Sequence, residues 1–75
     1  MSTLESVIRC DPEILGGTPV FAGTRVPFKN LVDYLSAGDT LERFLDHFPS
    51  VTREQAVAAL EIAGDLLASR ANTAR

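Results

Sequence analysis

The chain has 75 residues and a net charge of −3, which is enough for one small domain and too little for a second hydrophobic core. Its single cysteine excludes an internal disulfide and favours a reducing compartment, and one histidine with one cysteine cannot build a zinc site. No apolar run approaches the roughly 20 residues of a membrane span, and the first residues lack a signal peptide's basic stretch, so we expect a soluble cytoplasmic protein with no membrane association.

The small size and the uneven charge both bear on the partners of the chain. A chain of this length hides only about 60% of its unfolded surface, so its fold is marginal without a disulfide, a metal or a partner chain. Since the sequence supplies neither of the first two, we expect a homodimer.

Residues 39–69 carry two arginines against six acidic residues, whereas the tail 70–75 carries two arginines and no acid. This acidic helical body argues against strong phosphate-driven DNA binding by a monomer.

The first predicted element is a β arm over residues 7–26. Two of its β-favouring pieces, Val20-Phe21 and Thr24–Val26, are separated by Ala22-Gly23, a two-residue connection that predicts a hairpin. Another short β-prone run, residues 7–10, precedes them. Such an arm leaves an open strand edge, which the same arm of a second copy would cover. The residues before the arm, 1–6, show no pattern, and we expect them to be frayed.

Three helices are predicted over residues 27–69. Pro27 suits the first position of the first helix, and Gly38 suits its end. The second helix begins with Asp39 and Glu42, which are spaced as a capping box. Apolar residues mark one face of each helix: Phe28, Leu31, Val32 and Leu35 in the first, and Leu41, Phe44, Leu45 and Phe48 in the second.

The third predicted helix begins with a second capping box, Thr52 and Gln55, and continues to about Ser69. Its apolar surface covers about 200° of the helix, more than the ~100° stripe that a surface helix needs. One part is an ordinary core stripe of Ala56, Val57, Leu60, Ala63, Gly64 and Leu67, and a second row consists of Gln55, Ala59, Ile62 and Leu66. Either the β arm or the tail packs on this second row, or Ile62 and Leu66 contact another protein chain.

Catalysis and cofactor binding are not indicated by the sequence. The glycines of residues 16–27 are typical of turns, because glycine adopts positive φ without steric cost. A phosphate-binding loop would need a Lys-Ser/Thr pair, which this stretch lacks. Cys10 has no activating neighbour and is interpreted as a small packed hydrophobe, and His47 as a partly buried surface residue. We therefore expect no enzyme, no cofactor and no metal.

Three helices with short connections are typical of a helix-turn-helix unit, although generic helical bundles share this spacing. More specifically, residues 14–27 (Ile-Leu-Gly-Gly-Thr-Pro-Val-Phe-Ala-Gly-Thr-Arg-Val-Pro), 37–42 and 48–52 resemble the domain-of-unknown-function family 433. The resemblance covers about residues 7–68. It implies a mainly α fold, with a short β arm before a homeodomain-like helix-turn-helix. It also implies an antitoxin-like protein of bacteria or archaea, often encoded beside a PIN-like ribonuclease toxin.

The expected function is therefore that of an antitoxin in a type II toxin–antitoxin module. It would neutralise a PIN-like toxin by direct binding and autoregulate its operon by binding operator DNA. The alternative is a protein-interaction module that does not bind DNA. On DNA, the third helix would enter the major groove. The candidate residues for contacts with bases are Arg53 and Gln55. The candidates for contacts with phosphates are Ser50, Thr52 and Lys29. Otherwise Thr52 and Gln55 only cap the helix and Arg53 is an ordinary exposed charge.

Arg25 also has two interpretations. Its guanidinium could contact DNA, or it could hold carbonyls or an acidic neighbour in a structural role. For the toxin, the candidate contacts are Ile62 and Leu66 together with Arg70 and Arg75 of the tail. An arginine inserted into the nuclease could compete with its divalent metal. The alternative for residues 70–75 is a flexible, solvated terminus.

Overall fold

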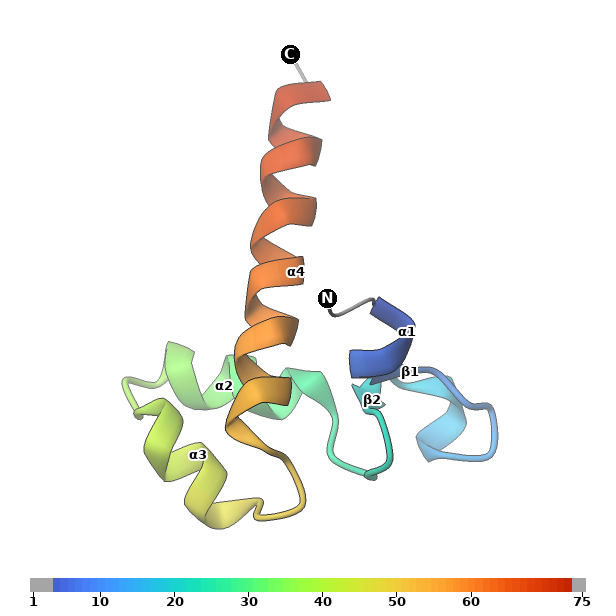
Figure 1. Cartoon of the computed structure of the whole chain (residues 1–75), viewed down its shortest axis with the longest axis vertical. Coiled ribbons are helices and arrows are strands. Elements are labelled where there is room, and N and C mark those ends of the chain that lie inside the picture. Colours follow the sequence, from blue (N-terminus) through green and yellow to red (C-terminus); the bar gives the residue numbers. More distant parts are fainter. Residues whose placement is uncertain (1–3, 74–75) are drawn as a thin grey trace.

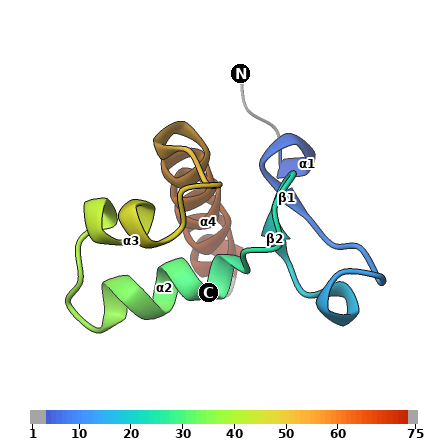
Figure 2. The same cartoon turned by 90° about the horizontal axis from the view of Figure 1, so that it is seen from below.

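The computed structural model describes residues 4–73 and is mainly helical, with a short two-stranded sheet before the main helices. The elements in chain order are α1 (Leu4–Val7), β1 (Ile8–Arg9), the 3-10 helix η1 (Leu15–Gly17), β2 (Val20–Phe21), α2 (Phe28–Ser36), α3 (Leu41–His47) and α4 (Arg53–Thr73). Figure 1 shows that the second half of α4 extends away from the other elements. From below, α3 lies to one side of α4 and the strands lie to the other (Figure 2). The expected fold class is confirmed.

The β arm forms with a different pairing from the one predicted. β1 and β2 are antiparallel, with Ile8 opposite Phe21 and Arg9 opposite Val20. The predicted strand over Thr24–Val26 does not form, and only an isolated bridge joins Val20 to Pro27. The reason is local: the Thr24 hydroxyl donates to the Phe21 carbonyl at 2.8 Å and accepts from the Val26 N–H at 3.0 Å. These side-chain bonds favour a turn over a strand.

The N-terminal segment is more ordered than expected. The sequence predicts frayed residues up to 6, but residues 4–7 form the helical turn α1, which packs against α4. Val7 at its end is buried in the core. This tertiary contact, which no local pattern encodes, explains the difference. Residues 1–3 of the predicted frayed segment lie outside the described residues.

The helix ends correct several predicted caps. Pro27 has ψ 141° and lies just before α2 instead of inside it. α3 is capped by Thr40, whose hydroxyl accepts from the Arg43 N–H at 3.1 Å, and not by Asp39. Gly38 has φ +91°, a conformation that favours glycine, and ends α2 as predicted. α4 continues to Thr73, so the expected flexible tail is helical through most of its length.

The core lies where the arm meets the three long helices. Its largest fully buried side chains are Phe21, Phe44, Leu31 and Val20. The Phe21 ring lies 6.0 Å from both the Phe28 and the Phe44 rings. Edge-to-face and tilted pairs at this spacing contribute about 0.5–1.5 kcal/mol each beyond their buried area. One aromatic residue of β2 therefore joins the arm to α2 and α3.

The buried faces of α2 and α4 are rotated from the predicted stripes. In α2, Val32 and Leu35 are exposed, and Tyr34 instead packs its ring 5.5 Å from Phe44. In α4, Val57 and Leu67 are exposed, whereas Ala59 of the predicted second row is buried. Ala56 of the predicted first row is also fully buried, and Leu60 of that row and Ile62 of the second row both pack against the core, so the buried face lies between the two predicted rows. Within residues 4–73, no helix is long and apolar enough to cross a membrane.

Replacing Phe44 by alanine should lower the free energy of unfolding by about 3–5 kcal/mol, because it removes a fully buried ring. Urea denaturation followed by circular dichroism measures this loss. Leu67→Ala is the matched control: its side chain is 71% exposed, and its effect should stay within about 0.5 kcal/mol. Equal losses for the two variants would contradict the packing described above.

Candidate functional site

The turn between α3 and α4 is fixed by a buried anchor and a helix cap. Val51 is buried in the core, and its N–H donates to the Phe48 carbonyl at 3.0 Å. The Thr52 hydroxyl accepts from the Gln55 N–H at 3.0 Å, which confirms Thr52 as the predicted N-cap. The first turn of α4, where a helix-turn-helix protein reads bases, is thus held in one position relative to α3.

Both predicted base readers are engaged within the chain. Arg53 Nη2 donates to Glu42 Oε2 of α3 at 2.9 Å. The Gln55 side chain reaches the arm, where its Nε2 donates to the Ala22 carbonyl at 2.8 Å. This bond links α4 to the turn after β2. The structure therefore gives Arg53 and Gln55 roles in joining elements of the fold.

The Arg53–Glu42 pair changes the acidity of the glutamate. The hydrogen bond from the Arg53 guanidinium lowers the pKa of Glu42 below its ordinary value of 4.5, and a bond from its own backbone and the charge of Arg53 add to this. Both side chains are more than half exposed, so solvent screens the pair. The pair therefore contributes little to the stability of the fold.

The other predicted DNA contacts, Lys29, Arg25 and Ser50, fall into two places. Lys29 lies on α2 and pairs with Asp33 through nitrogen–oxygen distances of 3.0 Å. Arg25 and Ser50 come from the arm and from the α3–α4 turn, and they line one cavity. The tertiary structure therefore brings Arg25 and Ser50 together and leaves Lys29 apart from them.

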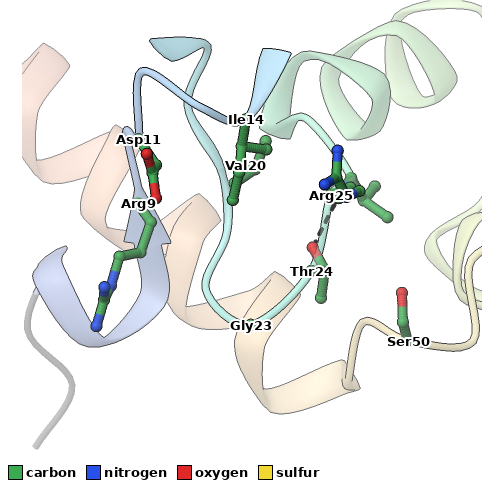
Figure 3. A pocket seen from close by; sticks show the side chains of 9 residues that line it. Arg9, Asp11, Ile14, Val20, Gly23, Thr24, Arg25 and Ser50 are labelled. Atoms are coloured by element: carbon green, nitrogen blue, oxygen red, sulfur yellow. Dashed lines mark hydrogen bonds between the residues drawn. The ribbon is translucent and has the colours of Figure 1, made fainter. Parts of the chain in front are cut away.

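This cavity, which we call the arm pocket, has a volume of about 720 Å³. Figure 3 shows Arg9 on one side, Arg25 on the other, and the turn at Gly23 between them. The lining residues are Arg9, Asp11, Ile14, Val20, Gly23, Thr24, Arg25, Val26 and Ser50. Sequence reasoning missed Arg9 as a site residue. The two-residue alternation of an extended chain was the available signal, since it places Arg9 and Asp11 on one face and Ile8 and Cys10 on the other.

The opposite face of β1 borders a second cavity, which we call the apolar groove. Its volume is about 350 Å³, and it is lined by Ile8, Cys10, Pro19, Phe28, Ala59, Ile62, Ala63 and Leu66. The predicted pair Ile62 and Leu66 therefore lies on one surface. Ile62 packs against the core and Leu66 is 56% exposed, so contact of Leu66 with another protein chain stays a prediction.

The other candidate residues are placed as follows. Arg70 is exposed in the last turns of α4, and Arg75 lies outside the described residues. Cys10 is exposed at the groove and is not the packed residue that we expected. His47 is also exposed, with its Nδ1 2.7 Å from the Tyr34 hydroxyl. Within the described part of the chain, no three His, Cys, Asp or Glu side chains are grouped to hold a metal ion.

Comparison with known proteins places the chain in a family. The family model described as Protein of unknown function (DUF433) matches residues 8–63. The chain belongs to this family. It is also 38% identical over 55 residues to the Uncharacterized protein y4eO of Sinorhizobium fredii (strain NBRC 101917 / NGR234). That alignment covers 73% of this chain and 25% of the relative, so the chain spans about a quarter of the relative's length. No solved structure matches.

The family match covers one part of the candidate site and ends before the other part. Within the DUF433 match lie the arm, α2, α3 and the first half of α4, and therefore the whole arm pocket. Ile62 of the apolar groove is inside the matched region, whereas Leu66 and Arg70 follow it. The exposed end of α4 is thus the part of the candidate site that lies beyond the family match.

Replacing Arg53 by glutamine should raise the pKa of Glu42 toward 4.5, because the guanidinium that holds the carboxylate charged is removed. A carboxyl group whose pKa is lower in the folded than in the unfolded protein stabilises the fold at any pH above its unfolded pKa. This contribution to the free energy of unfolding disappears as the pH falls through the pKa of the folded protein. The stability difference between wild type and Arg53→Gln should therefore shrink below pH 4.5. NMR titration of the Glu42 carboxyl measures the shift, with Lys29→Gln as a control that leaves it unchanged. Identical titration in all three proteins would show that the pair does not form in solution.

Proposed function

We propose that this DUF433 protein is the antitoxin of a type II toxin–antitoxin module. In this proposal it acts in the cytoplasm as a homodimer, binds and neutralises a PIN-like ribonuclease, and autoregulates its operon through operator DNA. Support comes from the family resemblance of the sequence and from two separate surfaces on one small fold. The arm pocket lies beside the start of α4, and the apolar groove lies along its middle.

The projecting second half of α4 is the observation that carries the proposal (Figure 1). Leu66 and Leu67 are the most exposed large apolar side chains of the described residues, at 56% and 71%. Burying one leucine side chain contributes about 1.5–3 kcal/mol. The projecting half of this 21-residue helix is shorter than the ~12–15 residues below which an isolated helix is marginal in water. A bound protein that covers Leu66 and the groove beside it would supply that packing.

The end of α4 gives the proposal a mechanism for neutralisation. A PIN-like nuclease holds its catalytic divalent metal with clustered carboxylates, and a guanidinium placed among them competes with the metal for the same charge. If a partner binds at Leu66, Arg70 lies one helical turn further on the same helix. Arg70 is therefore the first candidate for this contact, followed by Arg75.

The alternative function, a protein-interaction module without DNA binding, also has a specific observation in its favour. Arg53 and Gln55 are engaged with Glu42 and with the arm, and a base reader would have to leave these partners. The exposed Glu54 beside them would repel phosphates.

Anisotropy of labelled duplex DNA from the chain's own promoter separates the two functions. An antitoxin should bind this duplex, with an affinity that falls as salt rises, and the neighbouring ribonuclease should change the affinity. A module without DNA binding should bind the ribonuclease and leave the duplex free at every salt concentration. The second result would reject autoregulation while leaving neutralisation in place.

Leu66→Glu should weaken binding of the PIN-like ribonuclease encoded beside this chain by at least about tenfold, because it places a charge in the apolar contact. Isothermal titration calorimetry measures the loss, and circular dichroism checks that the helices remain. The matched control is Leu35→Glu, which adds the same charge at an exposed leucine of α2. Equal binding by both variants would remove the groove from the proposed interface.

A further inference from the structure

The basic side chains of this acidic chain are not equally free to bind anions. Three already pair with acidic residues at nitrogen–oxygen distances of 2.9–3.5 Å: Lys29 with Asp33, Arg43 with Asp39 and Arg53 with Glu42. Arg70 is also engaged. Among the residues that the structure describes, Arg9 and Arg25 have no acidic partner, and both line the arm pocket. The two uncompensated cations thus share one cavity.

The pocket combines these cations with polar and apolar groups in an arrangement that suits a nucleotide strand. Arg9 and Arg25 stand on opposite sides (Figure 3), while Ile14, Val20 and Val26 supply apolar wall. Asp11 also lines the pocket, and its carboxylate accepts from the Glu13 N–H at 2.9 Å. Two guanidinium groups against one carboxylate leave the pocket cationic.

The volume and the position of the arm pocket indicate which kind of anion fits it. A volume of about 720 Å³, with guanidinium groups on opposite sides, is larger than one phosphate needs and suits a ligand with several charged groups. Ser50 brings the α3–α4 turn to the pocket wall, three residues before α4 begins at Arg53. The N-terminal end of the second helix is the part that contacts bases in helix-turn-helix proteins. Phosphate contacts beside a recognition helix fix its register on the duplex.

We propose that the arm pocket binds the sugar–phosphate backbone of duplex DNA, with Arg9 and Arg25 as its phosphate ligands. Ile14 and Val26 would pack against the sugars between those phosphates. This inference deepens the DNA-binding part of the proposed function and rests on it. It assigns the backbone contact to the arm, which keeps Arg53 and Gln55 in their intramolecular bonds.

The test uses the full chain and a labelled random-sequence duplex of about 20 base pairs, with binding measured by anisotropy over a range of salt concentrations. Arg9→Gln and Arg25→Gln should each lower the slope of log K against log salt by about 0.9 and weaken binding at low salt. Both side chains are exposed, so the fold should survive. Arg43→Gln is the matched control, because it removes the same charge from α3 outside the pocket and should leave the slope unchanged.

Asp11→Asn should change the affinity for the duplex in the opposite direction from the two arginine variants. It removes the pocket's own carboxylate and should tighten duplex binding at low salt. In parallel, amide NMR shifts on adding the duplex should concentrate at Gly23, Thr24 and Ser50, which locates the ligand without any substitution. Weaker or unchanged binding by Asp11→Asn would count against the assignment.

The remaining outcomes separate this inference from the proposed function. Unchanged slopes for both arginine variants, slopes that fall equally in Arg43→Gln, or no duplex binding by the wild-type chain would each overturn it. Loss of ribonuclease binding in the arginine variants, with DNA binding intact, would overturn it in favour of an acidic protein surface. If the ribonuclease does not bind but the slopes change as expected, the antitoxin function fails and the arm pocket assignment stands.

Discussion

The packing of Phe21 against the rings of α2 and α3 is the interaction on which the rest of the structure depends. The sheet of the arm has only two residues in each strand, which is too short for independent stability. Burial of Phe21 between Phe28 and Phe44 fixes this sheet to the helices. The bond from Gln55 to the Ala22 carbonyl then fixes the adjoining turn to α4. Both cavities have walls from the arm and the helical unit, and both therefore depend on this attachment.

The extended backbone of β1 gives the arm two chemically different faces. Ile8 and Cys10 border the apolar groove, and Arg9 and Asp11 border the arm pocket. Consecutive residues of an extended chain point to opposite faces, so four residues contribute to two surfaces of opposite character. The protein can thus present a pocket lined by two arginines and an apolar groove without a second domain. Two such surfaces are what the proposed antitoxin function would require, since it calls for contact with both nucleic acid and a protein.

Net charge alone does not describe the charge that a ligand would meet at each surface of this chain. The acidic total predicts weak attraction to DNA, yet several acidic residues are paired with cations of neighbouring turns or helices. What a ligand meets is the local balance of charge, and at the arm pocket that balance is positive. The Arg53–Glu42 pair shows the same principle, because a basic residue at the start of α4 is already neutralised by α3.

The sequence by itself determined the mainly helical class, the N-terminal arm, the three long helices, the glycine stop at Gly38 after α2 and the cap at Thr52. These features depend on local geometry and on helical periodicity, which neighbouring residues encode. Only the tertiary structure decided that β2 pairs with residues 8–9, that α1 is a helical turn, and that Ala59 is buried while Val57 is exposed. It also decided that Arg9, Arg25 and Ser50 share a cavity and that Gln55 binds the arm. These outcomes join residues far apart in the chain. A wide apolar helix such as α4 has several faces of similar hydrophobicity, and the position of the arm selects which of them is buried.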